Sequence, residues 1–224
     1  MLKRTFYIVL LTSCGFSAEA QQDPQFTQYM FNSLFITPAY AGVDGVTQLT
    51  SFNRAQWLGY ESSFGGDGGA PTTFLFSFNT PIYKIKSGFG AYIMSDQLGP
   101  QTNSEAQVMY AYHVALRNSK ISFGIKAGMY SLAIDGRHYR YIHENDPLIV
   151  EGRESQIRPD VGFGVLYRAE KYYAGFGINH LLRSEFDFGV NEARNALENH
   201  MNITAGYYYE VNFDLKLNPT VLVK

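Results

Sequence analysis

The side chains that could bind a metal gather in one polar stretch of the chain. His138 and His143 lie there with Glu144, Asp146 and Glu151, which are imidazole and carboxylate ligand types. Their spacing matches neither the pair of ligands on one helical face nor the close pairs of a tight turn. We therefore interpret this stretch as a solvated loop and expect no metal site.

Signals for nucleophilic or phosphate chemistry are also missing. The chain has Ser, His and Asp but no G-x-S-x-G, the turn that presents a hydrolase nucleophile. The glycine run Gly65–Gly69 (GGDGG) has neither the Lys-Ser/Thr nor the helix of a phosphate-binding loop, so it predicts a flexible loop tip. The formal net charge is −2, without the basic stripe that nucleic-acid binding requires. We predict no enzyme, no cofactor and no nucleic-acid partner.

The first twenty residues indicate export. Lys3 and Arg4 precede an apolar stretch from Phe6 to Phe16, and Ala18 and Ala20 form an A-x-A cleavage site. Residues 1–20 are thus predicted to be a Sec signal peptide, too short to span a bilayer as a helix. In the alternative, Leu11 to Cys14 form a lipoprotein box. Cleavage after Ala20 would remove the single cysteine and leave packing and hydrogen bonds to stabilise the fold.

The mature chain alternates in the manner of β-strands. In residues 105–117, Val108, Tyr110 and Tyr112 fall on one side, with Gln107 and His113 on the other. The alternation predicts nine strands in one domain. Their ranges are 46–58, 71–79, 86–97, 105–117, 120–134, 160–169, 171–182, 199–213 and 213–223. In 160–169 a side of small residues, Gly162 and Gly164, could line a crowded interior.

Tight turns alternate with long connections. Residues 117–120 and 168–171 predict hairpins, whereas 60–70, 135–159 and 183–198 are expected to be long loops. This alternation, with 17 Tyr and 17 Phe, favours an antiparallel outer-membrane β-barrel over residues 46–224. The alternative is a secreted, soluble β-sandwich that binds a protein or carbohydrate through loop aromatics such as Tyr139 and Tyr141.

Two features refine the barrel interpretation. Bacterial barrels have an even number of strands, so nine strands predict either a C-terminally truncated chain or a sheet that another chain completes. Charges in membrane strands should face the interior, because an Arg or Lys facing lipid at mid-depth costs about 2–4 kcal/mol. We expect this of Lys126, Arg168, Glu210 and Lys216, and Ile125 and Ala127 must then face outward.

The mature front, residues 21–45, has a different pattern. Asp23 can cap a helix with Pro24 at its first position, and Pro38 and Gly42 would end the helical segment. Its shared face would hold Phe26, Tyr29, Met30, Ser33 and Leu34. Such a short helix must bury this face, either in its own domain or as a plug or partner surface.

This front, DPQFTQYMFNSLFITPAYAG, resembles the start of the PorP/SprF family of Bacteroidota type IX secretion proteins. The residues that carry the resemblance are Asp23, Pro24, Gln25, Tyr29, Phe31, Asn32, Pro38, Ala39, Tyr40, Ala41 and Gly42. Thr37 stands where the family usually has Asn. Residues 51–57 (SFNRAQW) and 217–224 (LNPTVLVK) are also similar to family segments.

The resemblance implies an outer-membrane barrel that contacts lipid and serves type IX export. Its partners would be subunits of the secretion machinery or one large exported adhesin, in some relatives used for gliding. The family has no catalytic residues. We take Asp23, Pro24, Gln25, Tyr29, Phe31, Asn32, Pro38, Tyr40 and Gly42 as the candidate partner or plug motif, with Tyr29, Phe31 and Tyr40 as buried anchors.

Overall fold

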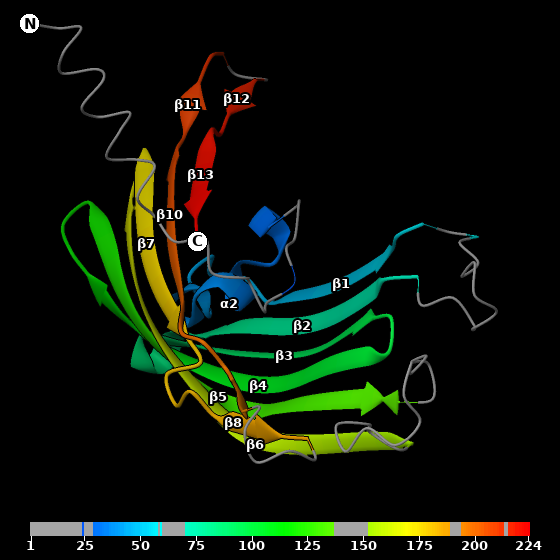
Figure 1. Cartoon of the computed structure of the whole chain (residues 1–224). Helices are drawn as coiled ribbons and strands as arrows, with labels where there is room; N and C mark the ends of the chain where they lie inside the picture. The colour runs from blue at the N-terminus through cyan, green and yellow to red at the C-terminus, as the bar shows by residue number, and fades with distance from the viewer. Residues whose placement is uncertain are drawn as a thin grey trace, which may run out of the picture.

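One curled antiparallel sheet forms the body of the molecule (Figure 1). The computed structural model describes residues 24, 29–57, 59, 70–136, 152–188, 194–212 and 215–224. In that part of the chain, nine strands pair in the order β1-β2-β3-β4-β5-β6-β7-β10-β13 and leave the sheet open between β1 and β13. The sequence prediction of an all-β antiparallel sheet of nine strands is confirmed.

Strands that are consecutive in the chain are mostly neighbours in the sheet. The sheet contains β1 (Gln48–Ala55), β2 (Thr72–Ile82), β3 (Ser87–Leu98), β4 (Gln101–Ala115), β5 (Ser119–Asp135), β6 (Arg153–Ala169), β7 (Tyr172–Asn179), β10 (His200–Tyr207) and β13 (Thr220–Val223). Two small hairpins pair β8 (Glu185–Asp187) with β9 (Arg194–Ala196) and β11 (Tyr209–Glu210) with β12 (Lys216–Leu217). The helical turns are η1 (Tyr29–Phe31), α2 (Ser33–Ile36), η2 (Pro38–Tyr40) and η3 (Tyr83–Ile85).

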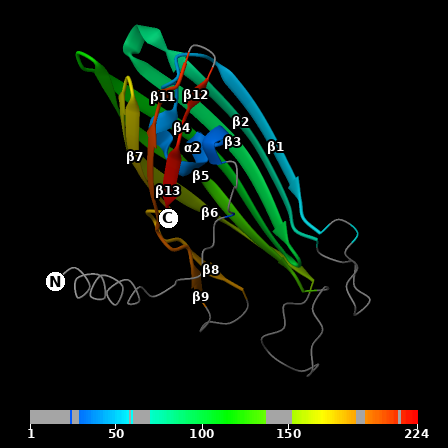
Figure 2. The same cartoon turned by 90° about the horizontal axis from the view of Figure 1, so that it is seen from above.

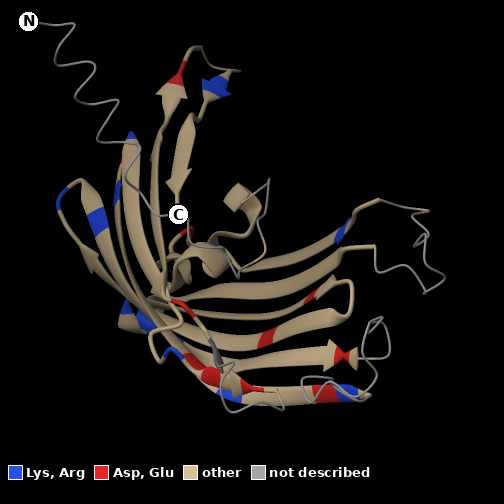
Figure 3. Ribbon diagram, in the orientation of Figure 1, with Lys and Arg blue, Asp and Glu red and all other residues tan. Residues whose placement is uncertain are grey.

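The two faces of the sheet are inverted relative to a water-soluble protein. Along β4 the apolar Val108, Tyr110 and Tyr112 are exposed on the convex outer face, whereas Gln107 and His113 are buried on the concave inner face. Other strands repeat this pattern, and charged residues are sparse over the middle of the sheet (Figure 3). An apolar exterior around a polar interior is the pattern of a membrane β-barrel. Within the described residues no second large sheet covers the apolar face, so the β-sandwich alternative is wrong.

A buried ionic cluster on the inner face confirms the inward direction expected of Lys126. Its Nζ lies 3.7 Å from Oδ2 of Asp160, and Ile125 and Ala127 face outward. Asp160 Oδ2 also accepts a hydrogen bond from Gln107 Nε2 at 2.9 Å, and Nδ1 of His180 lies 3.1 Å from Asp160 Oδ1. Three strands and the start of a loop are thereby joined through one carboxylate.

Several sequence boundaries were wrong. β6 begins at Arg153 rather than at 160, so it includes Pro159. Proline has no backbone N–H, and it is tolerated here because this part of β6 does not pair with β7. The strand predicted over 199–213 leaves the sheet at Tyr207. Glu210 and Lys216 therefore lie in the β11–β12 hairpin, where they are exposed and pair with each other at 2.7 Å.

The predicted polar loop 183–198 contains an inward-packed hairpin instead. Phe186 on β8 is fully buried against Tyr130 of β5, with the ring centroids 5.8 Å apart. Arg158 Nε of β6 donates to the Glu185 carbonyl at 2.9 Å. The apolar Phe186, Phe188 and Leu197 explain why these residues fold onto the inner face.

The buried cluster yields a stability prediction. Asp160→Ala should lower the free energy of unfolding by about 3–5 kcal/mol, because it leaves Lys126 buried without its carboxylate. Urea unfolding of the micelle-bound protein, followed by gel mobility, measures this. Glu170→Ala in an exposed turn should change it by less than about 0.5 kcal/mol. Lys126→Met with Asp160→Leu should recover the part of the loss that comes from the uncompensated Lys126 charge, and equal effects of Asp160→Ala and Glu170→Ala would contradict the assignment.

Candidate functional site

The N-terminal segment, residues 29–45, lies on the inner face of the sheet (Figures 1 and 2). It is a chain of short turns: η1, α2 and η2 follow one another, and Gly42 turns the backbone with a φ of +66°. Thr37 is extended at a φ of −154°, as expected for a residue before proline, and this separates α2 from η2. The single amphipathic helix predicted here is therefore wrong for the described residues.

A row of small residues on the inner face lies beneath this segment. The residues stand directly opposite one another on five neighbouring strands: Gly88 on β3, Ala111 on β4, Gly124 on β5, Gly164 on β6 and Gly177 on β7. We call them the small-residue row. It crosses the sheet perpendicular to the strands, so a chain can lie along it.

The segment touches this row with its own backbone. A Cβ on Gly88 would lie 2.1 Å from the Ala41 carbonyl oxygen, and one on Gly124 would lie 2.3 Å from the Ala39 nitrogen. At Gly177 the distance to the Ile36 carbonyl oxygen would be 2.5 Å. Real Cβ atoms do not approach backbone so closely, so glycine is what allows residues 36–42 to lie against the sheet.

Asparagine side chains on the inner face hold the segment through its peptide groups. Asn79 Oδ1 on β2 accepts a hydrogen bond from the Gly42 nitrogen at 2.6 Å. Asn179 Nδ2 on β7 donates to the Phe35 carbonyl at 3.4 Å, and Asn202 Nδ2 on β10 donates to the Ile36 carbonyl at 3.3 Å. Short turns leave many peptide groups unpaired, and these asparagines satisfy several of them.

Apolar contacts complete the docking. Leu34, Phe35 and Ala41 form a buried cluster with inner-face residues of β2, β3 and β4, namely Leu75, Tyr92, Met94, Met109 and Ala111. The rings of Phe35 and Tyr92 are 5.8 Å apart. Ala39 and Val43 pack with Leu166 of β6 in a second cluster.

Both ends of the segment make polar contacts with the later strands. Tyr29 Oη donates to Thr220 Oγ1 on β13 at 2.5 Å, and Asp44 pairs with Arg168 of β6. Burial, together with the nearby phenol of Tyr173, raises the pKa of the Tyr40 hydroxyl, which stays protonated. These groups position the segment, and none is arranged for acid, base or nucleophilic chemistry.

The predicted motif residues differ in how deeply they are buried. Asn32, Pro38 and Gly42 are buried, and Tyr29 and Tyr40 are half-buried. Phe31, expected as a buried anchor, is 66 % exposed, because Phe35 rather than Phe31 is directed at the sheet. Pro24 is irregular in structure, and Asp23 and Gln25, with the expected helix cap, lie outside the described residues.

Sequence reasoning missed most of the small-residue row, although a signal was present. Gly-Phe-Gly occurs three times, at 88–90, 162–164 and 175–177. On a strand this places the phenylalanine on one face and both glycines on the other. Phe89, Phe163 and Phe176 indeed lie on the outer face.

The described part of the chain contains no grouped metal ligands and no membrane-length helix. Within the described residues, no three His, Cys, Asp or Glu side chains are grouped to hold a metal. His138 and His143, with their neighbouring carboxylates, lie outside those residues, so the solvated-loop interpretation stays a prediction. None of the described helices is long and apolar enough to cross a membrane.

Comparison with known protein families gives a match over almost the whole chain. The sequence model of the family described as "Type IX secretion system membrane protein PorP/SprF" matches residues 18–224. No curated protein and no solved structure matches the chain. The family match covers the N-terminal segment and every strand of the sheet, so the chain belongs to the PorP/SprF family of type IX secretion system membrane proteins.

Proposed function

We propose that this protein is an outer-membrane β-barrel component of the type IX secretion system that supports export or surface attachment of secreted proteins. The observation that carries the proposal is the inverted sheet, apolar outside and polar inside, with the family motif packed against its inner face. Family membership supports a place among the membrane proteins of the secretion system. The finer role, and the presence of one large adhesin as a partner, are part of the proposal.

The connections between strands support an orientation. β4 and β5 are joined by residues 116–118, and β6 and β7 by residues 170–171, at one end of the sheet. The ends of β5 and β6 that flank residues 136–152, and those of β7 and β10 that flank residues 180–199, lie at the other end, together with the two-residue turn between β3 and β4. Outer-membrane barrels have short periplasmic turns and longer outer loops, so we assign the end without these two long connections to the periplasm.

The N-terminal segment would then lie in the periplasmic half of the barrel. Gly88 is the second residue of β3, close to the end that we assign to the periplasm, and Ala41 rests on it. We therefore propose that residues 21–45 form a fixed plug whose periplasmic side is available to subunits of the secretion machinery. A Sec signal peptide over residues 1–20 would deliver this front to the periplasm.

The membrane location predicts two measurements on cells that express the full chain. The protein should stay in the membrane pellet after carbonate extraction and should migrate faster on gels before heating than after. A folded barrel resists detergent unfolding at room temperature, which is the reason for the mobility shift. Release into the soluble fraction would refute the barrel, and the mass of the mature N-terminus would separate cleavage before Gln21 from acylation at Cys14.

Docking on the small-residue row predicts different effects for two neighbouring glycines of β3. Gly88→Ala should loosen the segment, because the new Cβ meets the Ala41 carbonyl oxygen at 2.1 Å, whereas Gly90→Ala meets no backbone atom and has as its nearest neighbour a terminal methyl of the Leu34 side chain at 3.0 Å. Hydrogen exchange of a peptide covering residues 36–45 should speed up at least tenfold in Gly88→Ala. Comparable protection in both variants would show that the segment does not depend on the row.

The plug role predicts a secretion defect. Cells whose only copy lacks residues 23–42 should release or display less type IX cargo, because the periplasmic surface is lost. Cargo in the medium and on the cell surface is quantified by immunoblotting, with the Gly90→Ala copy as the control. Normal barrel assembly together with normal export would remove the segment from the function.

A further inference from the structure

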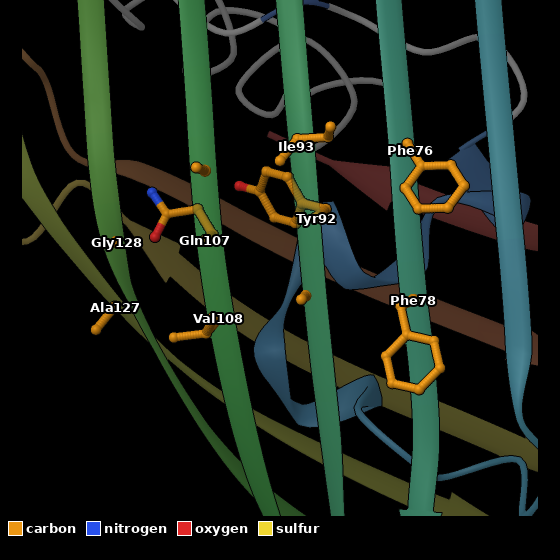
Figure 4. A pocket seen from close by; sticks show the side chains of 10 residues that line it. Phe76, Phe78, Tyr92, Ile93, Gln107, Val108, Ala127 and Gly128 are labelled. Carbon is orange, nitrogen blue, oxygen red and sulfur yellow. The ribbon is translucent and has the colours of Figure 1, made fainter.

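The outer face of the sheet contains a hollow at mid-height. It has a volume of about 420 Å³ and spans β2 to β5 (Figure 4). Four large side chains form its walls: Phe76, Phe78, Ile93 and Val108. Most of the outer face is convex and covered by large side chains, so this hollow interrupts an otherwise continuous apolar surface.

Small residues placed between the walls create the hollow. Ala91 stands opposite both Phe78 and Val108, and Ala127 stands opposite Val108 on the next strand. Ala106 likewise stands opposite Ile93. The floor is therefore made of methyl groups and backbone, with larger side chains rising around it.

The hollow lies far from both rims of the sheet. Val108 is near the middle of β4, which runs from 101 to 115, and Ala127 is near the middle of β5, which runs from 119 to 135. The apolar band of such barrels is about 25 Å tall, so lipid headgroups at its borders are roughly 12 Å away. Only the hydrocarbon interior of a membrane reaches this height.

The chemistry of the lining excludes a polar occupant. The two polar side chains among the lining residues are turned to the inner face, where the Gln107 amide donates to Asp160 and the Tyr92 hydroxyl donates to Glu105. A water molecule here would find no hydrogen-bond partners, and an empty hollow would leave its lining without dispersion contacts. The occupant must be apolar and must come from the surroundings of the outer face.

We propose that this hollow binds the terminal part of one acyl chain of a membrane lipid. The hollow opens onto the lipid-facing surface, so a flexible chain can bend into it and reach the alanine floor. Small residues on membrane surfaces can also let another protein approach closely, but the raised walls hold a rigid strand or helix away from this floor. The inference rests on the membrane location proposed above.

The test fills the hollow and counts immobilised lipid. The full-length protein is reconstituted in vesicles of phosphatidylethanolamine and phosphatidylglycerol that carry a phospholipid with a nitroxide near the chain end. Electron paramagnetic resonance gives the number of motionally restricted lipids per protein chain. Ala106→Leu with Ala127→Leu should lower this number by one. A nitroxide near the headgroup should report a smaller change, because the hollow takes the chain end.

A matched control is available elsewhere on the outer face. Ala174 and Ala205 are exposed and stand opposite each other on β7 and β10, outside the hollow. Ala174→Leu with Ala205→Leu should leave the lipid count unchanged. If the filled variant fails to fold, which the gel mobility shift reveals, Phe76→Ala removes one wall and should raise the mobility of the restricted chain.

The possible outcomes test the acyl-chain site and the membrane location independently. Equal lipid counts in the filled variant and the control would overturn the acyl-chain site while leaving the lipid-facing surface intact. An absence of restricted lipid in every variant would overturn the membrane location itself. Loss of a co-purifying membrane protein, with an unchanged lipid count, would assign the hollow to a protein partner and refute the lipid.

Discussion

Direct contact between two backbones is the constraint on which this structure depends. Residues 36–42 lie against the sheet at the small-residue row, where a single added methyl at Gly88 or Gly124 would overlap the segment's own peptide atoms. Glycine weakens a strand, so the row has a cost in sheet stability. The docked segment offsets this cost by burying Leu34, Phe35 and Ala41 and by covering the inner face. Segment and sheet are thus parts of one core, and turns as short as α2 would not persist without it.

The inverted polarity of the sheet makes such an internal partner necessary. Asparagine, glutamine and charged side chains point into the curl, where each polar group requires a hydrogen bond or an opposite charge. Two solutions occur on the described inner face. Lys126, Gln107 and His180 converge on the carboxylate of Asp160, whereas Asn79, Asn179 and Asn202 bind peptide groups of the segment. The short turns of the segment, which leave peptide groups free, are suited to this second solution.

Much of the fold could be predicted from the sequence, because alternation with a period of two is a local signal. The nine strands, their outer face and the inward direction of Lys126 followed from it. The structure of the N-terminal segment did not follow from the sequence. Three separate short turns carry the same spacing of apolar residues as one helix, and only Thr37 and Pro38 indicated a break. The small-residue row depends on register between strands, which a single sequence does not state. The β8–β9 hairpin was missed for a similar reason: Phe186 has a partner, Tyr130, that is close in space and distant in sequence.

The repeated Gly-Phe-Gly unit shows how one stretch of chain can meet two environments independently. Because successive side chains of a strand point to opposite faces, Gly88 and Gly90 face the segment while Phe89 faces outward. In 162–164 and 175–177 only the second glycine, Gly164 or Gly177, faces the segment, whereas a Cβ on Gly162 would meet Lys126 and one on Gly175 would meet Thr204. A change of the phenylalanine alters the outer surface, whereas a change of Gly88, Gly164 or Gly177 alters the contact with the segment. The interior docking and the exterior surface are therefore separable by substitution, although they are encoded within three consecutive residues.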